Sequence, residues 1–193
     1  MADGTTGRTL ILLRHAKAVD PDPYPTDLER PLSPRGRRDA AAAGDWLREQ
    51  GLLPDLVVCS TAVRTRETLD GLHLDKHDKH DKHGGHGGHG GHGGHGGHGG
   101  HGGHGKTVPV VFEHRVYLGP AHDTLDLLQN SPDVATLLLI GHNPTLSMLS
   151  DLLDPDALPD EGLATSGIAV HTVTGPWRDL ETAPLRAHHT ARG

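Results

Sequence analysis

The sequence predicts an α/β fold, a three-layer α/β/α sandwich with a largely parallel central sheet. Three runs of apolar residues, at 9–13, 56–59 and 135–140, are short and uninterrupted. Such runs are typical of strands that are buried on both faces. Segments with capping residues and helical spacing lie between them, and strands that alternate with helices indicate a sheet covered by helices on both sides.

The first half of the chain yields the elements in order. Residues 20–31 are rich in Pro and Asp and predict a loop after the first strand. Ser33 and Pro34 predict the cap and first turn of a helix that runs to Gln50, with Gly51 ending it. A helical segment that follows the second strand is expected to continue to about Leu72.

The second half repeats this alternation. Residues 108–112 predict a third strand and residues 123–129 a helix, ahead of the strand at 135–140. Asn143 and Pro144 open a helix to about Leu153, and residues 167–173 predict a closing strand. The sequence beyond Trp177 predicts no particular element.

A low-complexity stretch at 75–105 interrupts the chain. Histidine recurs there at every third position from His77 to His104, first in Asp-Lys-His units and then in Gly-Gly-His units. Glycine loses much backbone entropy on folding and the stretch has no apolar side chains to bury, so it predicts a disordered loop. We expect residues 1–74 and 106–193 to form a single domain that tolerates this insertion at modest entropic cost.

The regular histidines also suit metal ions. Neutral imidazoles at close spacing can bind zinc, nickel or copper, although slippage of a short repeat would produce the same pattern without a metal role. The candidate ligands, none of them catalytic, are His77, His80, His83, His86, His89, His92, His95, His98, His101 and His104.

Composition and charge limit the class of ligand and the compartment in which the protein works. A formal net charge of −7 argues against a general nucleic-acid binder, because binding to the phosphate backbone needs a basic face. The chain has 1 cysteine and therefore no intrachain disulfide. Its start does not resemble a signal peptide, and its longest apolar stretch, at 134–140, is too short to span a bilayer, so we expect a cytoplasmic protein without membrane contact.

Polar residues follow three of the predicted strands. Arg14 and His15 come after the first, residues 60–64 after the second, and His142 and Asn143 after the fourth. The carboxyl ends of parallel strands meet at one edge of a sheet, where ligands bind. Arginine holds phosphoryl oxygens through two parallel hydrogen bonds, and a neutral imidazole is a competent nucleophile near pH 7. Together they predict a site for phosphoryl transfer.

Three motifs resemble a known family. Leu-Arg-His-Ala at 13–16, Cys-Ser-Thr-Ala-Val-Arg-Thr-Arg-Glu-Thr at 59–68 and Gly-His-Asn-Pro at 141–144 resemble the histidine phosphatase superfamily, which is phosphoglycerate mutase-like in fold. Within it, the SixA-type phosphohistidine phosphatases are the most similar branch. The resemblance covers nearly the whole chain apart from the tract at 75–105.

The resemblance implies roles for individual residues. His15 becomes the phosphorylated nucleophile, and Arg14, Arg64 and His142 the phosphate pocket around it. Arg66 competes within the second motif, but Arg64 matches the family position. Three further residues are expected to contact substrate: Lys17 and Ser60 at the entrance and Asn143, whose position also suits a helix cap.

The general acid has one candidate. Glu113 follows the third predicted strand, and residues 113–117 are similar to the acid-bearing segment of the mutase-like members. The SixA branch often lacks an obvious acid, and a phosphoramidate leaving group needs less protonation than an alkoxide. A carboxylic acid that donates a proton near neutrality also needs a raised pKa.

The sequence therefore predicts a phosphatase that requires no cofactor and hydrolyses phosphohistidine or a small phosphomonoester through phospho-His15. Its partner would be a phosphorylated protein or a small-molecule phosphate. Two alternatives stay open: a phosphomonoesterase or mutase that acts on a metabolite, and a metal-buffering protein that works through the histidine tract. The sequence leaves the oligomeric state open.

Overall fold

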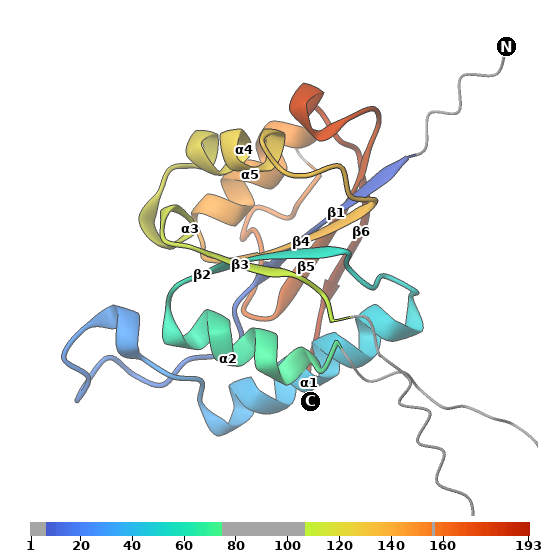
Figure 1. Cartoon of the computed structure of the whole chain (residues 1–193). Helices are drawn as coiled ribbons and strands as arrows, with labels where there is room; N and C mark the ends of the chain where they lie inside the picture. Colours follow the sequence, from blue (N-terminus) through green and yellow to red (C-terminus); the bar gives the residue numbers. More distant parts are fainter. Residues whose placement is uncertain (1–6, 75–106, 156) are drawn as a thin grey trace, which may run out of the picture.

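The computed structural model describes residues 7–74, 107–155 and 157–193 (Figure 1). Its strands are β1 (Arg8–Arg14), β2 (Leu56–Ser60), β3 (Val110–Glu113), β4 (Thr136–Gly141), β5 (Gly167–Val173) and β6 (Leu185–Thr190). Its α-helices are α1 (Pro34–Glu49), α2 (Val63–Leu72), α3 (Arg115–Leu118), α4 (Ala121–Gln129) and α5 (Thr145–Leu153). Two 3-10 turns are η1 (Asp27–Glu29) and η2 (Trp177–Asp179).

The strands form one sheet in the order β3-β2-β4-β1-β5-β6. β3, β2, β4 and β1 pair in parallel, whereas β5 and β6 are antiparallel to their neighbours. Strands from both sides of residues 75–106 thus belong to the same sheet. The predicted largely parallel sheet is confirmed.

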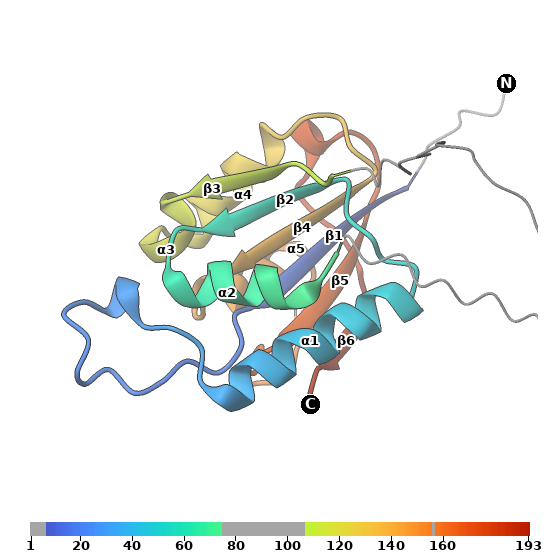
Figure 2. The same cartoon turned by 60° about the horizontal axis from the view of Figure 1, so that its bottom comes forward.

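Helices cover both faces of the sheet, with α1 and α2 on one side and α3, α4 and α5 on the other (Figures 1 and 2). A hydrophobic core lies on each face of the sheet, and alternate residues of β1 point into one or the other. Leu10 and Leu12 pack on the α4 and α5 side, and Ile11 and Leu13 pack on the α1 and α2 side. All four are fully buried, as the uninterrupted apolar run predicts. The three-layer arrangement is therefore confirmed.

Most predicted elements are present with small shifts at their ends. Ser33 caps α1 as predicted, because its hydroxyl accepts a hydrogen bond from the Gly36 amide at 3.0 Å. The predicted helix at 123–129 begins earlier, at Ala121, and the third strand begins and ends later than 108–112. Two elements carry no clear sequence signal, the short helix α3 and the edge strand β6.

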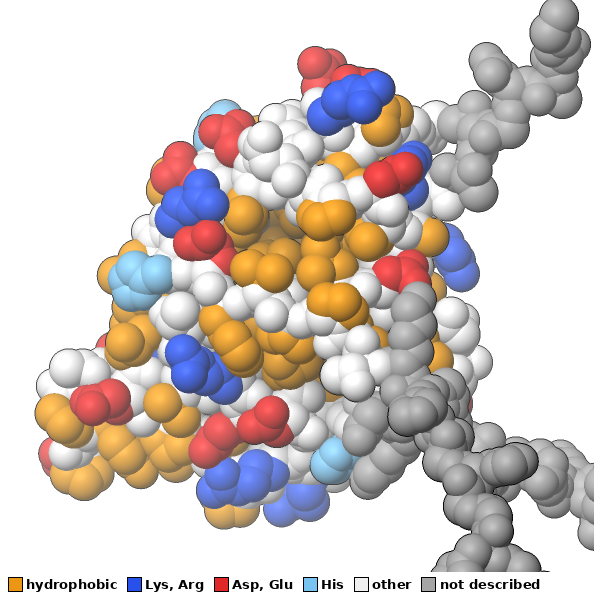
Figure 3. Space-filling model, in the orientation of Figure 1, with side chains coloured by type: hydrophobic (Ala, Val, Ile, Leu, Met, Phe, Trp, Pro, Cys, Tyr) orange, Lys and Arg blue, Asp and Glu red, His pale blue; other side chains and the backbone are white. Residues whose placement is uncertain are grey.

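β3 lies at the edge of the sheet and is far more exposed than the other parallel strands. Val110, Val111 and Phe112 are 39%, 47% and 48% exposed, whereas every residue of β2 is buried. Figure 3 shows apolar side chains gathered on this side of the molecule, ringed by charges of both signs. The run at 108–112 is thus a strand, but a surface one.

The predictions for the histidine tract and for membrane contact concern residues or properties that the structure describes only in part. The histidines at 77–104 lie outside the described residues, and with them the predicted metal ligands and the predicted disorder. Within the described ranges, none of the helices combines the length and apolar character needed to cross a membrane.

Candidate active site

The backbone of His15 is fixed at the carboxyl end of β1. Its amide donates to the Gly141 carbonyl of β4 at 3.0 Å, and its carbonyl accepts from the Ser166 amide at 3.2 Å. The next amide, of Ala16, donates to the Thr68 hydroxyl of α2 at 3.1 Å. Strand β4, the turn before β5 and helix α2 therefore hold the backbone around His15 in place.

The His15 ring presents one unprotonated nitrogen to the site. Nδ1 lies 2.7 Å from the Ala16 carbonyl oxygen, which can only accept, so Nδ1 carries the proton. Nε2 faces the Arg64 Nε–H at 3.3 Å with its lone pair. Burial lowers the pKa of His15 to about 4, and the charges of Arg64 and Arg14 add to this. The ring is therefore neutral at pH 7.

His142 follows β4 and stands against His15, with ring centroids 5.0 Å apart. Arg64 Nη2 donates to its Nδ1 at 3.2 Å, which leaves the proton on Nε2 for the Ser60 hydroxyl at 2.8 Å. Burial lowers the pKa of His142 to about 3, helped by the neighbouring His15 and Arg64. A second neutral imidazole thus lines the site.

Arg64, in the first turn of α2, connects the whole cluster. Its guanidinium is buried, and Nε and Nη2 contact His15 and His142 as described. Nη1 donates to the Asp27 carbonyl at 2.6 Å, and Nη2 also donates to the Asp27 carboxylate at 2.8 Å. One buried cation therefore joins three parts of the chain.

Arg14 lies on the side of the site next to β5. Its Nη1 donates to the Leu163 carbonyl at 2.7 Å, while its buried Nε has no hydrogen-bond partner among the described residues. Asn143 donates to the same carbonyl at 2.8 Å and accepts from the Ser147 hydroxyl. The amide of Asn143 thus ties the loop before β5 to the start of α5, and Arg14 keeps a free donor.

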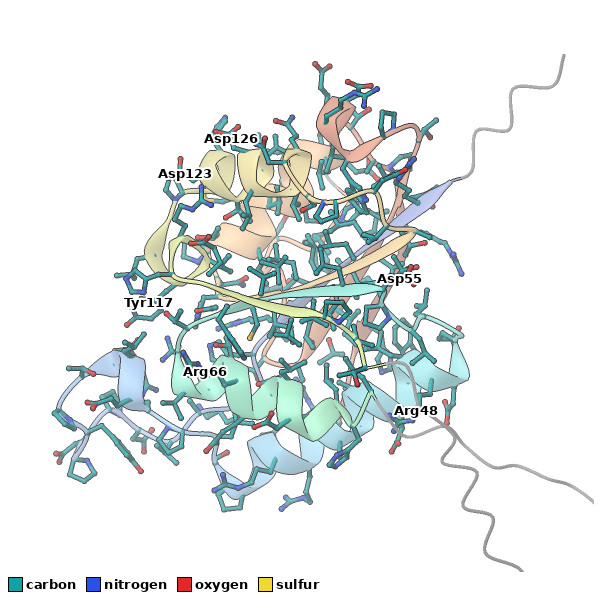
Figure 4. All side chains as sticks on the ribbon, viewed as in Figure 1. Arg48, Asp55, Arg66, Tyr117, Asp123 and Asp126 are labelled. Atoms are coloured by element: carbon teal, nitrogen blue, oxygen red, sulfur yellow. The ribbon has the colours of Figure 1, made fainter. Side chains whose placement is uncertain are left out.

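Asp27 and Tyr117 belong to the site although the sequence predicted neither. The Tyr117 hydroxyl donates to Asp27 Oδ2 at 2.9 Å, and its ring meets the His142 ring edge-on with centroids 5.4 Å apart. Figure 4 shows Tyr117 projecting from α3 toward the segment that contains η1. Asp27 is an aspartate in a loop rich in Pro and Asp, and Tyr117 ends the segment 113–117, in which only Glu113 was given a role.

Ser60 and Lys17 do not share the entrance position expected of them. The expectation is wrong for Ser60, because its side chain is fully buried beneath His142 at the end of β2. Lys17 is exposed, and its backbone carbonyl accepts hydrogen bonds from the amide and hydroxyl of Ser33. Ser60 therefore orients a ring, whereas Lys17 contributes its carbonyl to the start of α1.

Glu113 and Arg66 make their hydrogen bonds and ring contacts with residues other than His15 and His142. The Glu113 carboxylate accepts from the amide and the guanidinium of Arg115, both at 3.0 Å. These hydrogen bonds lower the pKa of Glu113. Arg66 lies over the Phe112 ring of β3, 4.7 Å from its centroid, on the surface seen in Figure 4. Of the two arginines in the second motif, Arg64 is the one in contact with His15.

Two other chemistries find little support in the described residues. Burial raises the pKa of the Cys59 thiol to about 12, so it stays protonated and unreactive near neutrality. Across residues 7–74, 107–155 and 157–193, no three His, Cys, Asp or Glu side chains are grouped to hold a metal ion.

A hollow of about 640 Å³ adjoins Asn143, between α5 and the loop before β5. Asp151, Asp160 and Glu161 lie in its lining. Carboxylates repel a phosphate anion, and the cationic donors face the His15 side instead. The histidines and arginines therefore suit an anion better than this hollow does.

The fold and the site together define a class of protein. Two neutral imidazoles and a buried guanidinium meet at the carboxyl edge of a parallel sheet, an arrangement suited to a phosphoryl group. The class is thus an α/β protein with a cluster of histidine and arginine at the strand ends.

Known proteins resemble the chain closely enough to name its family. A model of the histidine phosphatase superfamily (branch 1) matches residues 10–82. An uncharacterized protein of Mycobacterium tuberculosis is 34% identical over 192 residues, covering 93% of this chain and 100% of the relative. A solved structure named as a phosphohistidine phosphatase SixA, from Nakamurella multipartitia, is 30% identical with a TM-score of 0.73 and covers 96% of both chains.

The chain belongs to the histidine phosphatase superfamily, in its SixA-type branch. A further SixA structure, from Agrobacterium tumefaciens, shares the fold with a TM-score of 0.68 at 23% identity, over 94% of this chain and 97% of the other. Membership identifies the protein as a phosphatase.

Proposed function

We propose that this phosphatase hydrolyses phosphohistidine or a small phosphomonoester through a covalent phospho-His15 intermediate. The observation that carries the proposal is the orientation of the His15 ring. Its Nδ1–H is bonded to the Ala16 carbonyl, which leaves the Nε2 lone pair facing the Arg64 guanidinium. A nucleophile with a fixed tautomer beside a fixed cation is what attack on a phosphoryl group requires.

The first half of the reaction forms the intermediate. The Nε2 lone pair attacks phosphorus, and the bond from phosphorus to the leaving group breaks with its electron pair on that group. Arg64 and the unpartnered Nε of Arg14 would hold the equatorial oxygens, where negative charge is spread in the transition state. His142 would complete the pocket. In the second half, a water oxygen bonds to phosphorus, the bond from phosphorus to His15 Nε2 breaks with its electron pair returning to Nε2, and inorganic phosphate leaves.

The substrate class follows from the branch and from the chemistry of the leaving group. The relative from Nakamurella multipartitia is named for activity on phosphohistidine, and we extend this substrate class to the present chain. An imidazole leaves phosphorus more easily than an alkoxide, so such a substrate places little demand on a proton donor. Comparing a phosphohistidine peptide with sugar phosphates would separate this function from that of a metabolite phosphatase.

The central test is His15→Ala. We expect the variant to lose turnover of p-nitrophenyl phosphate and to acquire no acid-labile phosphate, whereas the wild type is labelled in a rapid quench. His122→Ala, a histidine exposed on α4, is the matched control and should retain both properties. Retained turnover in His15→Ala would refute the proposal.

Glu113 stays a prediction as the proton donor to the leaving group. Its carboxylate is engaged by Arg115, so it would have to turn toward the site in order to donate. Glu113→Gln should then impair hydrolysis of an alkyl phosphate much more than that of p-nitrophenyl phosphate, whose leaving group needs no proton. If Glu113→Gln changes the rates of both substrates by the same factor, Glu113 is not the proton donor.

Catalysis without a metal is also part of the proposal. Guanidinium groups supply the positive charge that divalent cations supply in other phosphoryl-transfer sites. Turnover is expected to survive prolonged dialysis against EDTA. A loss of turnover that added zinc or magnesium restores would contradict this point.

A further inference from the structure

Asp27 sits where a second catalytic group would be needed. It begins η1, in the loop between β1 and α1, and its carboxylate accepts a hydrogen bond from the guanidinium of Arg64. Its side chain is 48% exposed, so water can reach it.

We propose that Asp27 is the general base of the second half-reaction and takes a proton from the water that attacks phospho-His15. The inference rests on the proposed function, since it presupposes that intermediate.

Arg64 brings the carboxylate and the nucleophile to one place. Its Nε faces His15 Nε2 at 3.3 Å, and its Nη2 donates to Asp27 Oδ2 at 2.8 Å. A phosphoryl group on His15 Nε2 would take Nε and Nη2 for its oxygens. Nη1 would still hold the Asp27 carbonyl at 2.6 Å, so the loop stays in place when the carboxylate yields its contact.

Two more groups keep the carboxylate beside the phosphoryl position. Arg30, at the end of η1, donates to Oδ1 at 2.5 Å, and the Tyr117 hydroxyl of α3 donates to Oδ2 at 2.9 Å. Tyr117 also contacts the His142 ring, so its hydroxyl has a defined direction. Asp27 therefore remains oriented toward the site without Arg64 Nη2.

The charges around Asp27 keep its carboxylate ionised. Arg30 faces it from η1, Arg64 from α2 and Tyr117 from α3, with neutral His142 beyond them. Burial raises the pKa of Asp27, but hydrogen bonds from Arg30 and Tyr117 and the charge of Arg64 outweigh this and lower it to about 2. The carboxylate is ionised at neutral pH and can accept a proton without prior loss of one.

The step balances without another reactant. A water oxygen forms a bond to phosphorus, and the bond from phosphorus to His15 Nε2 breaks with its electron pair returning to Nε2. One proton of that water passes to Asp27 Oδ2, and the product leaves as inorganic phosphate. Asp27 then releases its proton to solvent and recovers its contact with Arg64.

Asp27→Asn separates the two half-reactions. With p-nitrophenyl phosphate, we expect a burst of about one equivalent of nitrophenol at the wild-type rate, then turnover slowed about 100-fold or more, as removal of a general base predicts. Acid-labile phosphate should accumulate on His15. Asp22→Asn, an exposed carboxylate in the same loop, is the control and should turn over normally.

Two outcomes would overturn the assignment. A burst slowed as much as the steady state would mean that Asp27 only positions Arg64, and normal turnover would mean that it has no role. Failure of the proposed function looks different, because the wild type itself would then form no phosphoenzyme.

Tyr117→Phe tests the same base through a positioning residue. Loss of the hydroxyl removes a hydrogen bond to the charged carboxylate and raises the pKa of Asp27. Without this hydrogen bond the carboxylate can turn away from the site, so dephosphorylation should slow while the burst keeps its wild-type rate. An unchanged dephosphorylation rate would contradict the positioning role of Tyr117 and the role of Asp27.

Discussion

The two sides of the site are built in different ways. The side that carries His15 and His142 stands at the ends of central strands, and its two rings are neutral, largely buried and fixed by backbone or hydroxyl partners. The opposite side consists of Asp27, exposed on a loop, and Tyr117, half-buried on a four-residue helix. Arg64 joins the two sides, because its guanidinium donates hydrogen bonds to both His15 and Asp27.

This difference separates two requirements of catalysis. Attack on phosphorus needs a nucleophile and cations that do not reorganise, and buried strand ends provide them. Proton transfer to or from water needs an accessible group that can adjust its contacts, and a loop provides that. Variants on each side should therefore fail in different ways.

The largest effect is expected where the sides join. Arg64→Lys keeps the charge but cannot contact His15, His142 and Asp27 at once, because an ammonium lacks the planar fork. We expect kcat to fall about 1000-fold, as for loss of a transition-state donor. Arg66→Lys, two residues along the same helix and stacked on Phe112, is the control. Steady-state kinetics with p-nitrophenyl phosphate would measure both, and a loss below tenfold in Arg64→Lys would refute the joining role.

Stability should show the same contrast between centre and edge. Leu139, fully buried in β4, leaves a cavity when replaced by Ala, and we expect a loss of about 3 kcal/mol in the free energy of unfolding. Phe112→Ala in β3 removes a side chain that is 48% exposed and should cost about 1 kcal/mol or less. Urea denaturation measures both, and equal losses would mean that β3 is buried by a contact in solution.

Acid should destabilise the protein through its neutral histidines. The folded pKa values of His15 and His142, about 4 and about 3, lie below the ordinary 6.5. As pH falls below 6.5, His15 and His142 bind protons in the unfolded chain but stay neutral in the folded one. The free energy of unfolding therefore decreases between pH 6.5 and 4. We expect a loss of about 2 kcal/mol or more between pH 7 and pH 5.

The measurement is urea denaturation at both pH values. His142→Gln, which cannot titrate, should lose less stability on acidification than the wild type, whereas His122→Gln on the exposed face of α4 should behave as the wild type. A wild-type stability independent of pH in this range would show that the two rings are not held neutral.

The sequence predicted the central side of the site far better than the peripheral one. Apolar runs reveal buried strands, and the polar residues at their ends must then converge, which is how Arg14, His15, Arg64 and His142 could be found together. Ser60 was placed at the entrance because sequence does not show which way a strand-end side chain points. The structure turns it inward beneath His142.

The peripheral side lacks comparable signals. Asp27 looks like any acidic residue in a loop rich in Pro and Asp, and only the fold of that loop brings it to Arg64. Strand β6 was missed because Leu185–Thr190 is largely polar and lies at an edge, and α3 because four residues are too few to show helical periodicity. Residues defined by long-range contacts leave little trace in local sequence.

The smallest effect is expected at the opposite end of the sheet. Arg8, in the first position of β1, pairs with Asp133, whose side chain is 81% exposed. Exposed ion pairs contribute little, so Asp133→Asn should change the free energy of unfolding by less than about 1 kcal/mol and leave turnover unaltered. Asp27→Asn also removes the charge of an arginine partner, yet there the loss should appear in the dephosphorylation rate. A change in turnover from Asp133→Asn would mean that the strand ends are coupled along β1, and the division between a rigid centre and an independent periphery would fail.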